Sequence, residues 1–367
     1  MASTITLRLR PLLNAIGAGL SMALCIACGG GGGGTGNATP PVGTTPPVVT
    51  PAISVLAGSP TESGEVDGSG TAARFIGPTP LTIDTSGNLY AGASCAIRKI
   101  TPSGVVSLYA GTYCTGTTQN GFPTAFALAA ASGGRLFMTD YGLDVFEVSP
   151  TGTTRTVAVL EAPTGGGRGA GIGFGNGLAV DAAGNLIVTT GFGARRLSPS
   201  GSYTMLEGAA SGEAGLNTYV PERRGVAVDA AGTVYLASYD ATILRIDTAG
   251  KTTVLAGSSG QSGARDGTGA DARFYGIVAL ALDGQGNLYA AESGLLRDSS
   301  GISTRTTLIR KITPAGVVTT IAGKPGVNEL QTGALPGSLS LLGGIAVDGK
   351  GNLYASSGST IVKIVLP

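Results

Sequence analysis

LALDGQGNLY (residues 280–289) and five variants of this phrase recur along the 367-residue chain and decide its fold. Each copy joins an alternating stretch of small apolar residues to a polar turn and a second apolar stretch. The shared glycine stands at positions 87, 134, 184, 232, 286 and 351, so successive copies are 47 to 65 residues apart. A fixed phrase at such a period is typical of an array of similar supersecondary units. The other copies are LTIDTSGNLY (81–90), ALAAASGGRLF (127–137), LAVDAAGNLI (178–187), VAVDAAGTVY (226–235) and IAVDGKGNLY (345–354).

A second hairpin follows the phrase in each unit. In the first unit, Ile97-Arg98-Lys99-Ile100 leads through the turn Thr101-Pro102-Ser103-Gly104 into an apolar stretch that ends at Gly111. The same pattern recurs at 309–323 and, with a shorter turn, at 244–257. Two hairpins per unit make four antiparallel strands, which is the composition of a propeller blade. The sequence therefore predicts an all-β, six-bladed β-propeller.

The two ends of the repeat region complement each other. The last unit stops after its third strand, 360–366, whereas the region begins with Ile53-Ser54-Val55-Leu56-Ala57-Gly58, which matches the fourth-strand segment 253–257. We expect the N-terminal strand to complete the last blade and close the ring, which would leave no open edge there.

These motifs resemble the NHL-repeat propellers in the form seen in bacterial secreted proteins. The resemblance covers residues 53–367 and rests on the phrase G-x-A-V-D-x-x-G-N-L-Y and the hairpin I-R-K-I-T-P-x-G-V-V. The second unit departs most, because Ala131 stands in place of the aspartate and Gly134-Arg135-Leu136-Phe137 replaces Gly-Asn-Leu-Tyr.

The N-terminal segment predicts a cellular address. Arg8 and Arg10 precede an apolar stretch, 11–27, that is typical of a signal peptide. Its end, Leu24-Cys25-Ile26-Ala27-Cys28-Gly29, resembles the lipobox of bacterial lipoproteins, which implies a signal peptide at 1–27 and lipidation of Cys28. The Gly/Thr/Pro-rich residues 28–52 are expected to form a tether to the membrane. The alternative is an ordinary secreted protein. Gly29 resembles the sorting pattern of outer-membrane lipoproteins, so we expect an envelope protein held to the outer membrane only through its lipid.

Composition excludes several chemistries. The chain has no histidine, which rules out Ser-His-Asp and Cys-His nucleophiles and zinc sites that need imidazole. Removal of the two arginines of the signal peptide leaves 21 basic residues against 22 acidic ones. A chain without a basic field is not expected to bind nucleic acid. Neither a metal nor a cofactor is expected.

Long loops are predicted to gather on one face of the ring, because loops after the second and fourth strands of a four-stranded meander emerge together. These loops are 59–77, 112–125, 161–176, 207–222, 258–276 and 324–340, and an insertion, Glu292 to Thr307, joins them from the fifth unit. Function on repeat scaffolds concentrates in such loops. The candidate ligand-binding residues on this face are Tyr113, Phe122, Arg168, Phe174, Tyr219, Arg265, Tyr275 and Arg297.

Two of these loops share a pattern, Asp67-Gly68-Ser69-Gly70 through Arg74-Phe75 and Asp266-Gly267-Thr268-Gly269 through Arg273-Phe274. One interpretation is a calcium site. Against it, Thr71 in the first loop and Ala270 in the second stand where a calcium loop places an oxygen ligand, and neither loop has the glutamate expected at its twelfth position. The favoured interpretation is structural, with the phenylalanine packed between blades and the arginine paired with a loop aspartate. The pairs Arg195-Arg196 and Arg223-Arg224 are read as solvated charges.

Cys95 and Cys114 are predicted to form a disulfide. Both lie in loops on the same face, and an oxidising compartment favours pairing. Two free thiols are the alternative.

Two functions of different classes remain open. The first is a lipid-anchored envelope module, a monomeric propeller that holds a protein, peptide or glycan on the long-loop face. The alternative is a calcium-dependent hydrolase similar to the lactonases with this ring shape, for which Glu213, Glu222, Glu292 and Asn176 would have to converge on the central channel.

Overall fold

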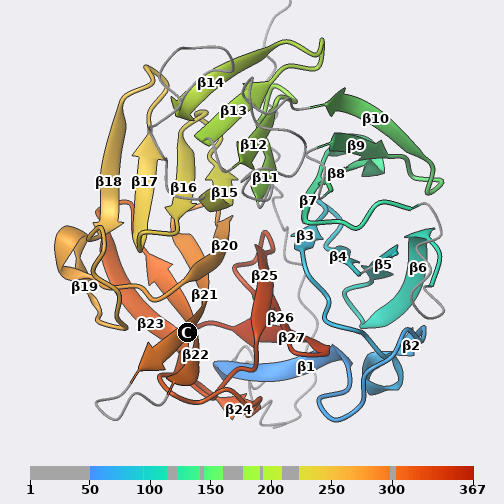
Figure 1. Cartoon of the computed structure of the whole chain (residues 1–367). Helices are drawn as coiled ribbons and strands as arrows, with labels where there is room; N and C mark the ends of the chain where they lie inside the picture. The colour runs from blue at the N-terminus through green and yellow to red at the C-terminus, as the bar shows by residue number, and fades with distance from the viewer. Residues whose placement is uncertain are drawn as a thin grey trace, which may run out of the picture. The chain divides into compact units, whose positions relative to one another are not determined.

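The computed structural model describes residues 50–93, 95–113, 122–140, 144–159, 177–190, 193–208, 223–297 and 303–367. All of them belong to one compact unit, Val49–Pro367. Six antiparallel sheets follow one another around a ring, with the first strand of each sheet nearest the centre (Figure 1). The predicted six-bladed β-propeller is therefore confirmed. Within the described ranges there is no α-helix, and so no helix that could cross a membrane.

The blades are numbered in chain order. Blade 1 has β3 (Leu81–Ile83), β4 (Leu89–Gly92), β5 (Ala96–Ile100), β6 (Val105–Gly111) and β2 (Gly68–Ser69). Blade 2 has β7 (Ala127–Ala130), β8 (Leu136–Thr139), β9 (Asp144–Val148) and β10 (Thr154–Val159). Blade 3 has β11 (Gly177–Val180), β12 (Leu186–Thr190), β13 (Gly193–Leu197) and β14 (Tyr203–Gly208).

Blade 4 has β15 (Arg223–Val228), β16 (Val234–Ser238), β17 (Thr242–Ile246) and β18 (Thr252–Gly257). Blade 5 has β20 (Ile277–Leu282), β21 (Leu288–Arg297), β22 (Ser303–Ile312), β23 (Val317–Lys324) and β19 (Gly267–Thr268). Blade 6 has β25 (Leu342–Val347), β26 (Leu353–Ser357), β27 (Thr360–Val365), β1 (Ala52–Gly58) and β24 (Gly333–Ala334). Three single-turn 3-10 helices complete the elements: η1 (Gly70–Ala72), η2 (Ser132–Gly134) and η3 (Gly269–Asp271).

The ring closes as the two chain ends predicted. The N-terminal strand β1 pairs antiparallel with β27, with Ile53 opposite Ile364 and Gly58 opposite Thr360. Ile53 and Ala57 are buried, while Ser54 between them faces solvent. Backbone hydrogen bonds within the sheet of blade 6 therefore join the N-terminal strand to the C-terminal strand.

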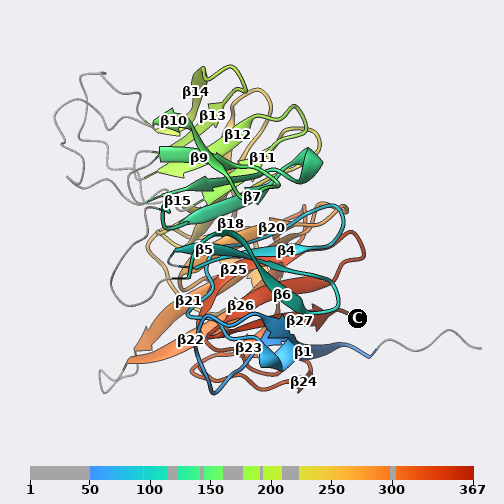
Figure 2. The same ribbon diagram turned by 90° about the vertical axis from the view of Figure 1, so that its right-hand side faces the viewer.

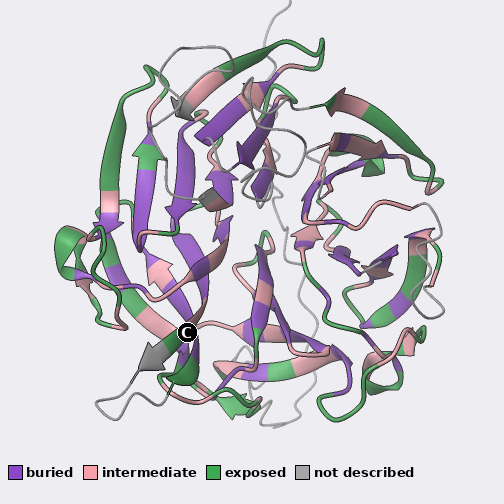
Figure 3. Ribbon diagram, in the orientation of Figure 1, coloured by how far each residue is buried: buried purple, intermediate pink, exposed green. Residues whose placement is uncertain are grey.

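The core consists of six apolar layers, each between two neighbouring blades. The inner and middle strands are largely buried, and the outer strands are largely exposed (Figure 3). This distribution explains why the first two strands of the repeats read as nearly continuous runs of apolar and small residues.

Side-chain hydrogen bonds hold the turn of the repeated phrase. In blade 1, Asp84 Oδ1 accepts the backbone N–H groups of Ser86 and Asn88 at 2.9 and 2.8 Å. Its Oδ2 accepts Asn88 Nδ2 at 2.9 Å and the Tyr90 hydroxyl at 3.1 Å. Gly87 has a φ of +82°, a conformation that favours glycine. Burial would raise the pKa of Asp84, but these hydrogen bonds outweigh it and hold the pKa below its usual value. Asp283 and Asp348 are held in the same way.

The structure adds two details to the predicted strands. Blades 1, 5 and 6 have five strands rather than four, because loops supply the two-residue strands β2, β19 and β24 at the outer edge. In blade 1 the loop is fixed there by Asp67, whose Oδ2 accepts the Leu108 N–H of β6 at 3.1 Å. The insertion in blade 5 is a hairpin rather than a loop where it is described, since β21 and β22 remain paired from Leu288–Ile312 to Arg297–Ser303. In Figure 2 both strands project at the left of the view.

Candidate functional site

The central channel opens on the long-loop face through a cavity of about 360 Å³. All six inner strands, or the residues just before them, contribute to its wall. The lining is apolar, with Leu81, Leu128, Leu178 and Leu280 around the axis, and Arg224 is the one charged residue that contributes to it among the described residues. The channel mouth thus offers apolar surface and, at one side, a guanidinium.

A larger pocket of about 600 Å³ lies between blades 4 and 5 on the same face. Arg224 contributes to this pocket as well, and its guanidinium carbon stands 5.1 Å from the centre of the Tyr239 ring. Tyr239 is 62% exposed, so the opposite part of its ring is open to a ligand. The remaining lining includes Asp240, Tyr275, Ser262, Ser293 and Leu295. We call this cavity the blade 4–5 pocket.

The projecting hairpin forms one wall of the blade 4–5 pocket. Ser293, Gly294 and Leu295 of β21 line it, and Leu295 is 53% exposed. Gly294 approaches Tyr275 so closely that a Cβ atom there would stand 2.5 Å from the Tyr275 Cβ. The glycine therefore lets the hairpin pack against the loop that carries Tyr275.

The predicted binding residues occupy different environments in the structure. Tyr275 does line the blade 4–5 pocket, as predicted for the long-loop face. Tyr113 instead donates its hydroxyl to Asp67 Oδ1 at 2.6 Å, below the Arg98 guanidinium, and so belongs to a structural cluster. Phe122 packs into the apolar layer between blades 1 and 2. Arg265 donates from Nε to the Asp271 carbonyl at 2.8 Å and holds its own loop.

Other predicted residues lie outside what the structure describes: Cys28, Cys114, Arg168, Phe174, Tyr219 and the side chain of Arg297. Cys95 is fully buried, and its carbonyl accepts the N–H of Thr112 at 3.1 Å. This contact brings the backbone just before Cys114 next to Cys95, and the disulfide stays a prediction.

The two aspartate loops have the structural role that was favoured, with one correction. Phe75 and Phe274 are buried between blades as predicted. The loop aspartates do not pair with the loop arginines, however. Asp67 and Asp266 pair with Arg98 and Arg310, at 2.7 and 2.8 Å, from the third strands of their blades. Both arginines are buried, and each also donates to two backbone carbonyls of its loop.

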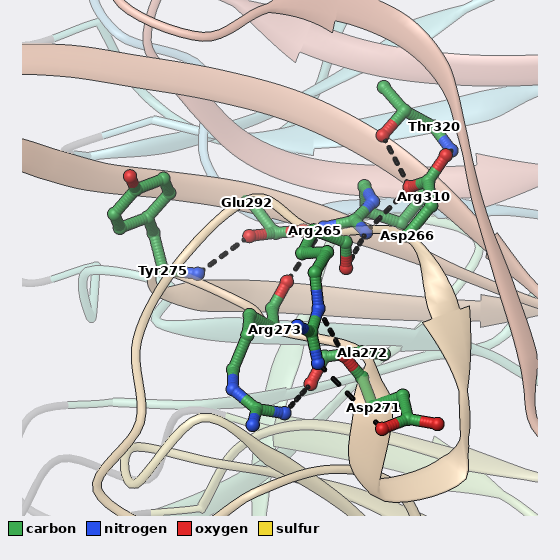
Figure 4. A network of polar contacts seen from close by, with 9 residues as sticks. All are labelled: Arg265, Asp266, Asp271, Ala272, Arg273, Tyr275, Glu292, Arg310 and Thr320. Carbon is green, nitrogen blue, oxygen red and sulfur yellow. Dashed lines mark hydrogen bonds and ion pairs between the residues drawn. The ribbon is translucent and has the colours of Figure 1, made fainter.

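Blade 5 carries one further buried acid, Glu292 (Figure 4). Ala93 stands at the corresponding position of blade 1. Arg310 donates to Glu292 Oε1 at 2.8 Å, and the Tyr275 backbone N–H donates to Oε2 at 2.8 Å. Both charged side chains are fully buried. Glu292 thereby anchors the backbone of a pocket residue, Tyr275. Because it is paired within the blade, it does not serve as the channel carboxylate that the hydrolase alternative requires.

Glu292 predicts an unusual pH dependence of stability. Burial raises its pKa to about 7, against the opposing effects of Arg310 and the Tyr275 N–H. Between about pH 4.5 and 7 the folded protein therefore holds a proton that the unfolded chain has lost, so this group's contribution to stability falls as pH rises through that window. Glu292→Gln should remove this dependence. Urea unfolding at half-unit steps from pH 5 to 8 measures it, and equal slopes for both proteins would contradict the assignment.

The structure corrects the interpretation of both arginine pairs as solvated charges. Arg224 is half-buried over Tyr239, and Arg195 is 2% exposed beneath Tyr203, at 5.2 Å from its ring centre. Arg196 is partly buried and lies 3.5 Å from Asp181. The first arginine of the third strand is buried in blades 1, 3 and 5 alike, and comparison of those strands could have revealed it. Tyr239 had no sequence signal, because it follows β16 at a position that differs between units.

No group of three His, Cys, Asp or Glu side chains that could hold a metal ion occurs among the described residues. Glu213, Glu222 and Asn176 lie outside the described ranges.

No protein-family model and no curated protein sequence matches this chain. Similar solved structures include a protein of unknown function from Bacteroides thetaiotaomicron, with a TM-score of 0.65 and 18% identity over 86% of this chain and 76% of that chain. An auxiliary nutrient binding protein from the same organism has a TM-score of 0.61 and 16% identity over 86% and 76%. A gluconolactonase from Xanthomonas campestris has a TM-score of 0.53 and 13% identity over 80% and 86%. At these identities the likeness shows the fold alone.

Proposed function

We propose that this chain is a lipid-anchored binding protein of the bacterial cell envelope that holds a glycan in the blade 4–5 pocket. The pocket carries the proposal. Its volume of about 600 Å³ falls in the range of about 300–1,000 Å³ that is usual for small-ligand sites. Phenol rings, a guanidinium, a carboxylate and hydroxyl groups together suit a ligand that has apolar faces and many hydroxyl groups. A peptide or protein ligand is less well matched, since Leu295 is the one exposed aliphatic side chain among the described residues that line the pocket.

The predicted cellular location supports the same proposal. A signal peptide at 1–27, a lipidated Cys28 and a tether to residue 52 would hold the propeller at the outer membrane, where glycans are available. One structural neighbour is an auxiliary nutrient binding protein, and a role of that kind fits an envelope propeller. Residues 53–367 would then form the whole binding domain, and its contact with the membrane would be through lipid alone.

Binding should depend on Tyr239. We expect the full chain to retain a subset of oligosaccharides on a glycan array, and Tyr239→Ala to weaken their binding at least about tenfold, as loss of an aromatic anchor does. Val254→Ala is the matched control, because Val254 lies on the outer strand of the same blade, 57% exposed and outside the pocket. Unchanged binding by the Tyr239 variant would contradict the site.

The hairpin wall gives a second variant for the same measurement. Replacing 295–305 by Asn-Gly would join Gly294 to Thr306, which face each other across the hairpin, through a two-residue turn. We expect this variant to fold and to lose binding. An array without any retained glycan, together with a saturable calcium-dependent rise in Tm, would instead favour the hydrolase alternative.

A further inference from the structure

Tyr109 of blade 1 fills the space between blades 1 and 2 on the short-turn face. Tyr109 stands at the bulge of β6, between the pairs Ile97–Ala110 and Arg98–Leu108. Its ring meets Tyr90 edge to face at 4.9 Å between centroids. Its hydroxyl donates to the carbonyls of Gly134 and Ser149, at 2.9 and 3.1 Å, which belong to the two short turns of blade 2. One phenol thus fills the gap and satisfies the turns across it.

The corresponding gap between blades 2 and 3 lacks this filling. The bulge residue of β10 is Val157, between the pairs Val145–Ala158 and Phe146–Thr156. Phe137 takes the place of Tyr90 and has no hydroxyl, and Ala131 takes the place of the bracing aspartate. A cavity of about 540 Å³ opens there on the short-turn face, and all three residues line it. The residues at which the second unit differs from the other units therefore leave a cavity between blades 2 and 3.

The far wall of this cavity keeps the acceptors that a tyrosine would meet. Gly184 and Ser198 occupy the turn positions of Gly134 and Ser149, and both line the cavity. Among the described residues, no side chain donates to either carbonyl. Across the next gap, in contrast, Arg196 donates to the carbonyl of the equivalent glycine, Gly232, at 3.2 Å. The cavity between blades 2 and 3 thus has the hydrogen-bond acceptors that surround the Tyr109 phenol one blade earlier, but no tyrosine within the described part of blade 2 occupies it.

We propose that this cavity binds a 4-hydroxyphenyl group, in the position that Tyr109 occupies one blade earlier. The ring would lie edge to face with Phe137, and the hydroxyl would donate to the Gly184 and Ser198 carbonyls. Arg155, which is 71% exposed and pairs with Glu147 at the rim, provides polar contacts for whatever is attached to the ring. This site lies on the face opposite the blade 4–5 pocket, and the proposal is independent of the glycan function.

N-acetyl-tyrosinamide is the probe, and N-acetyl-phenylalaninamide is its matched control without the hydroxyl. Titration of each into the full chain, followed by calorimetry, should show the tyrosine compound binding at least about fivefold more tightly, since only it can donate to the two carbonyls. The free phenol p-cresol distinguishes the source of the ring: weaker binding than the tyrosine compound assigns the site to a peptide side chain, and equal binding assigns it to a small phenol. Equal binding of the tyrosine and phenylalanine compounds would overturn the proposal.

Val157→Tyr is the decisive variant, because it rebuilds the filling of blade 1 inside blade 2. We expect it to abolish binding of N-acetyl-tyrosinamide and to raise the Tm. Val159→Tyr adds the same ring two residues further along β10, at a position that is 50% exposed and outside the cavity, and should leave binding unchanged. If Val157→Tyr proved unfolded by circular dichroism, the milder Phe137→Ala should still weaken binding at least about fivefold by removing the ring contact. Full binding by a folded variant of either kind would refute the site.

Discussion

Arg310→Met is expected to destabilise the propeller by about 3–5 kcal/mol at pH 8, because it leaves Glu292 as a buried charge without its partner. Arg310 also donates to the backbone carbonyls of Arg265 and Arg273, each at 3.0 Å, and these two hydrogen bonds are lost at the same time. Chemical unfolding in urea measures the loss. Because burial already raises the pKa of Glu292 to about 7, the variant protein should hold Glu292 neutral at pH 5.5 and lose less stability there.

Two comparison variants isolate the buried charge. Arg98→Met in blade 1 removes a similar arginine, but the acid left behind, Asp67, has a side chain that is 41% exposed and can remain hydrated. We expect a smaller loss there, roughly 1–3 kcal/mol, because the two backbone carbonyls that Arg98 binds keep backbone N–H donors. The double variant Arg310→Met with Glu292→Gln keeps an acceptor for the Tyr275 N–H and should recover part of the loss. A cost for Arg310→Met no larger than that of Arg98→Met would show that Glu292 does not drive the effect.

Blade 6 shows that a blade can form without these charges. Val362 stands at the position of Arg310, and Ser357 stands at the position of Glu292, since they occupy the same places relative to the paired strands β26 and β27. The loop position of Asp266 is held by Thr332. In blade 1, by contrast, Arg98 and Asp67 pair while Ala93 stands at the position of Glu292, so the arginine–aspartate pair does not depend on the glutamate. Retention of the network in blade 5, beside the blade 4–5 pocket, is consistent with a role in positioning Tyr275.

The repeated phrase was sufficient to predict the architecture. Its two apolar stretches alternate with turns, and its aspartate, asparagine and tyrosine form one hydrogen-bonded brace on the turn in blades 1, 5 and 6. The closure by β1 was also predictable, because a missing fourth strand and an unassigned matching strand stand at opposite ends of the chain. Both inferences concern local, repeated interactions, which a single sequence contains in several copies.

The pocket could not be predicted in the same way. Arg224 and Tyr239 meet through the pairing of β15 with β16 inside blade 4, whereas the opposite wall of the pocket comes from blade 5. Arg224 has no counterpart in the other units. The partner of Asp266 was mistaken for a similar reason, since the buried arginine that binds it lies 44 residues away on β22. The insertion in blade 5 was recognised by its length, but its pairing as a hairpin depends on a register that the flanking strands impose. Long-range packing fixed each of these features.

Ile53→Asp is expected to open the ring, with a loss of at least about 3 kcal/mol in the free energy of unfolding. Ile53 is 1% exposed and packs against Leu339, Val362 and Ile364 in the layer between blades 5 and 6. A carboxylate at this position would be buried among aliphatic side chains with no described cation in the cluster. Thermal and urea unfolding of the full chain measure the loss.

Ser54→Asp is the matched control, because Ser54 is the next residue on β1 and faces solvent. The same charge there should cost less than about 0.5 kcal/mol, as surface substitutions usually do. When β1 detaches, β27 becomes an edge strand with unpaired backbone groups, so the Ile53 variant should also form dimers by exchange of β1 between chains. Light scattering at two protein concentrations detects them. Equal stability of the two variants would mean that β1 only covers the last blade, whereas a loss confined to Ile53→Asp shows that the N-terminal strand holds the ring closed.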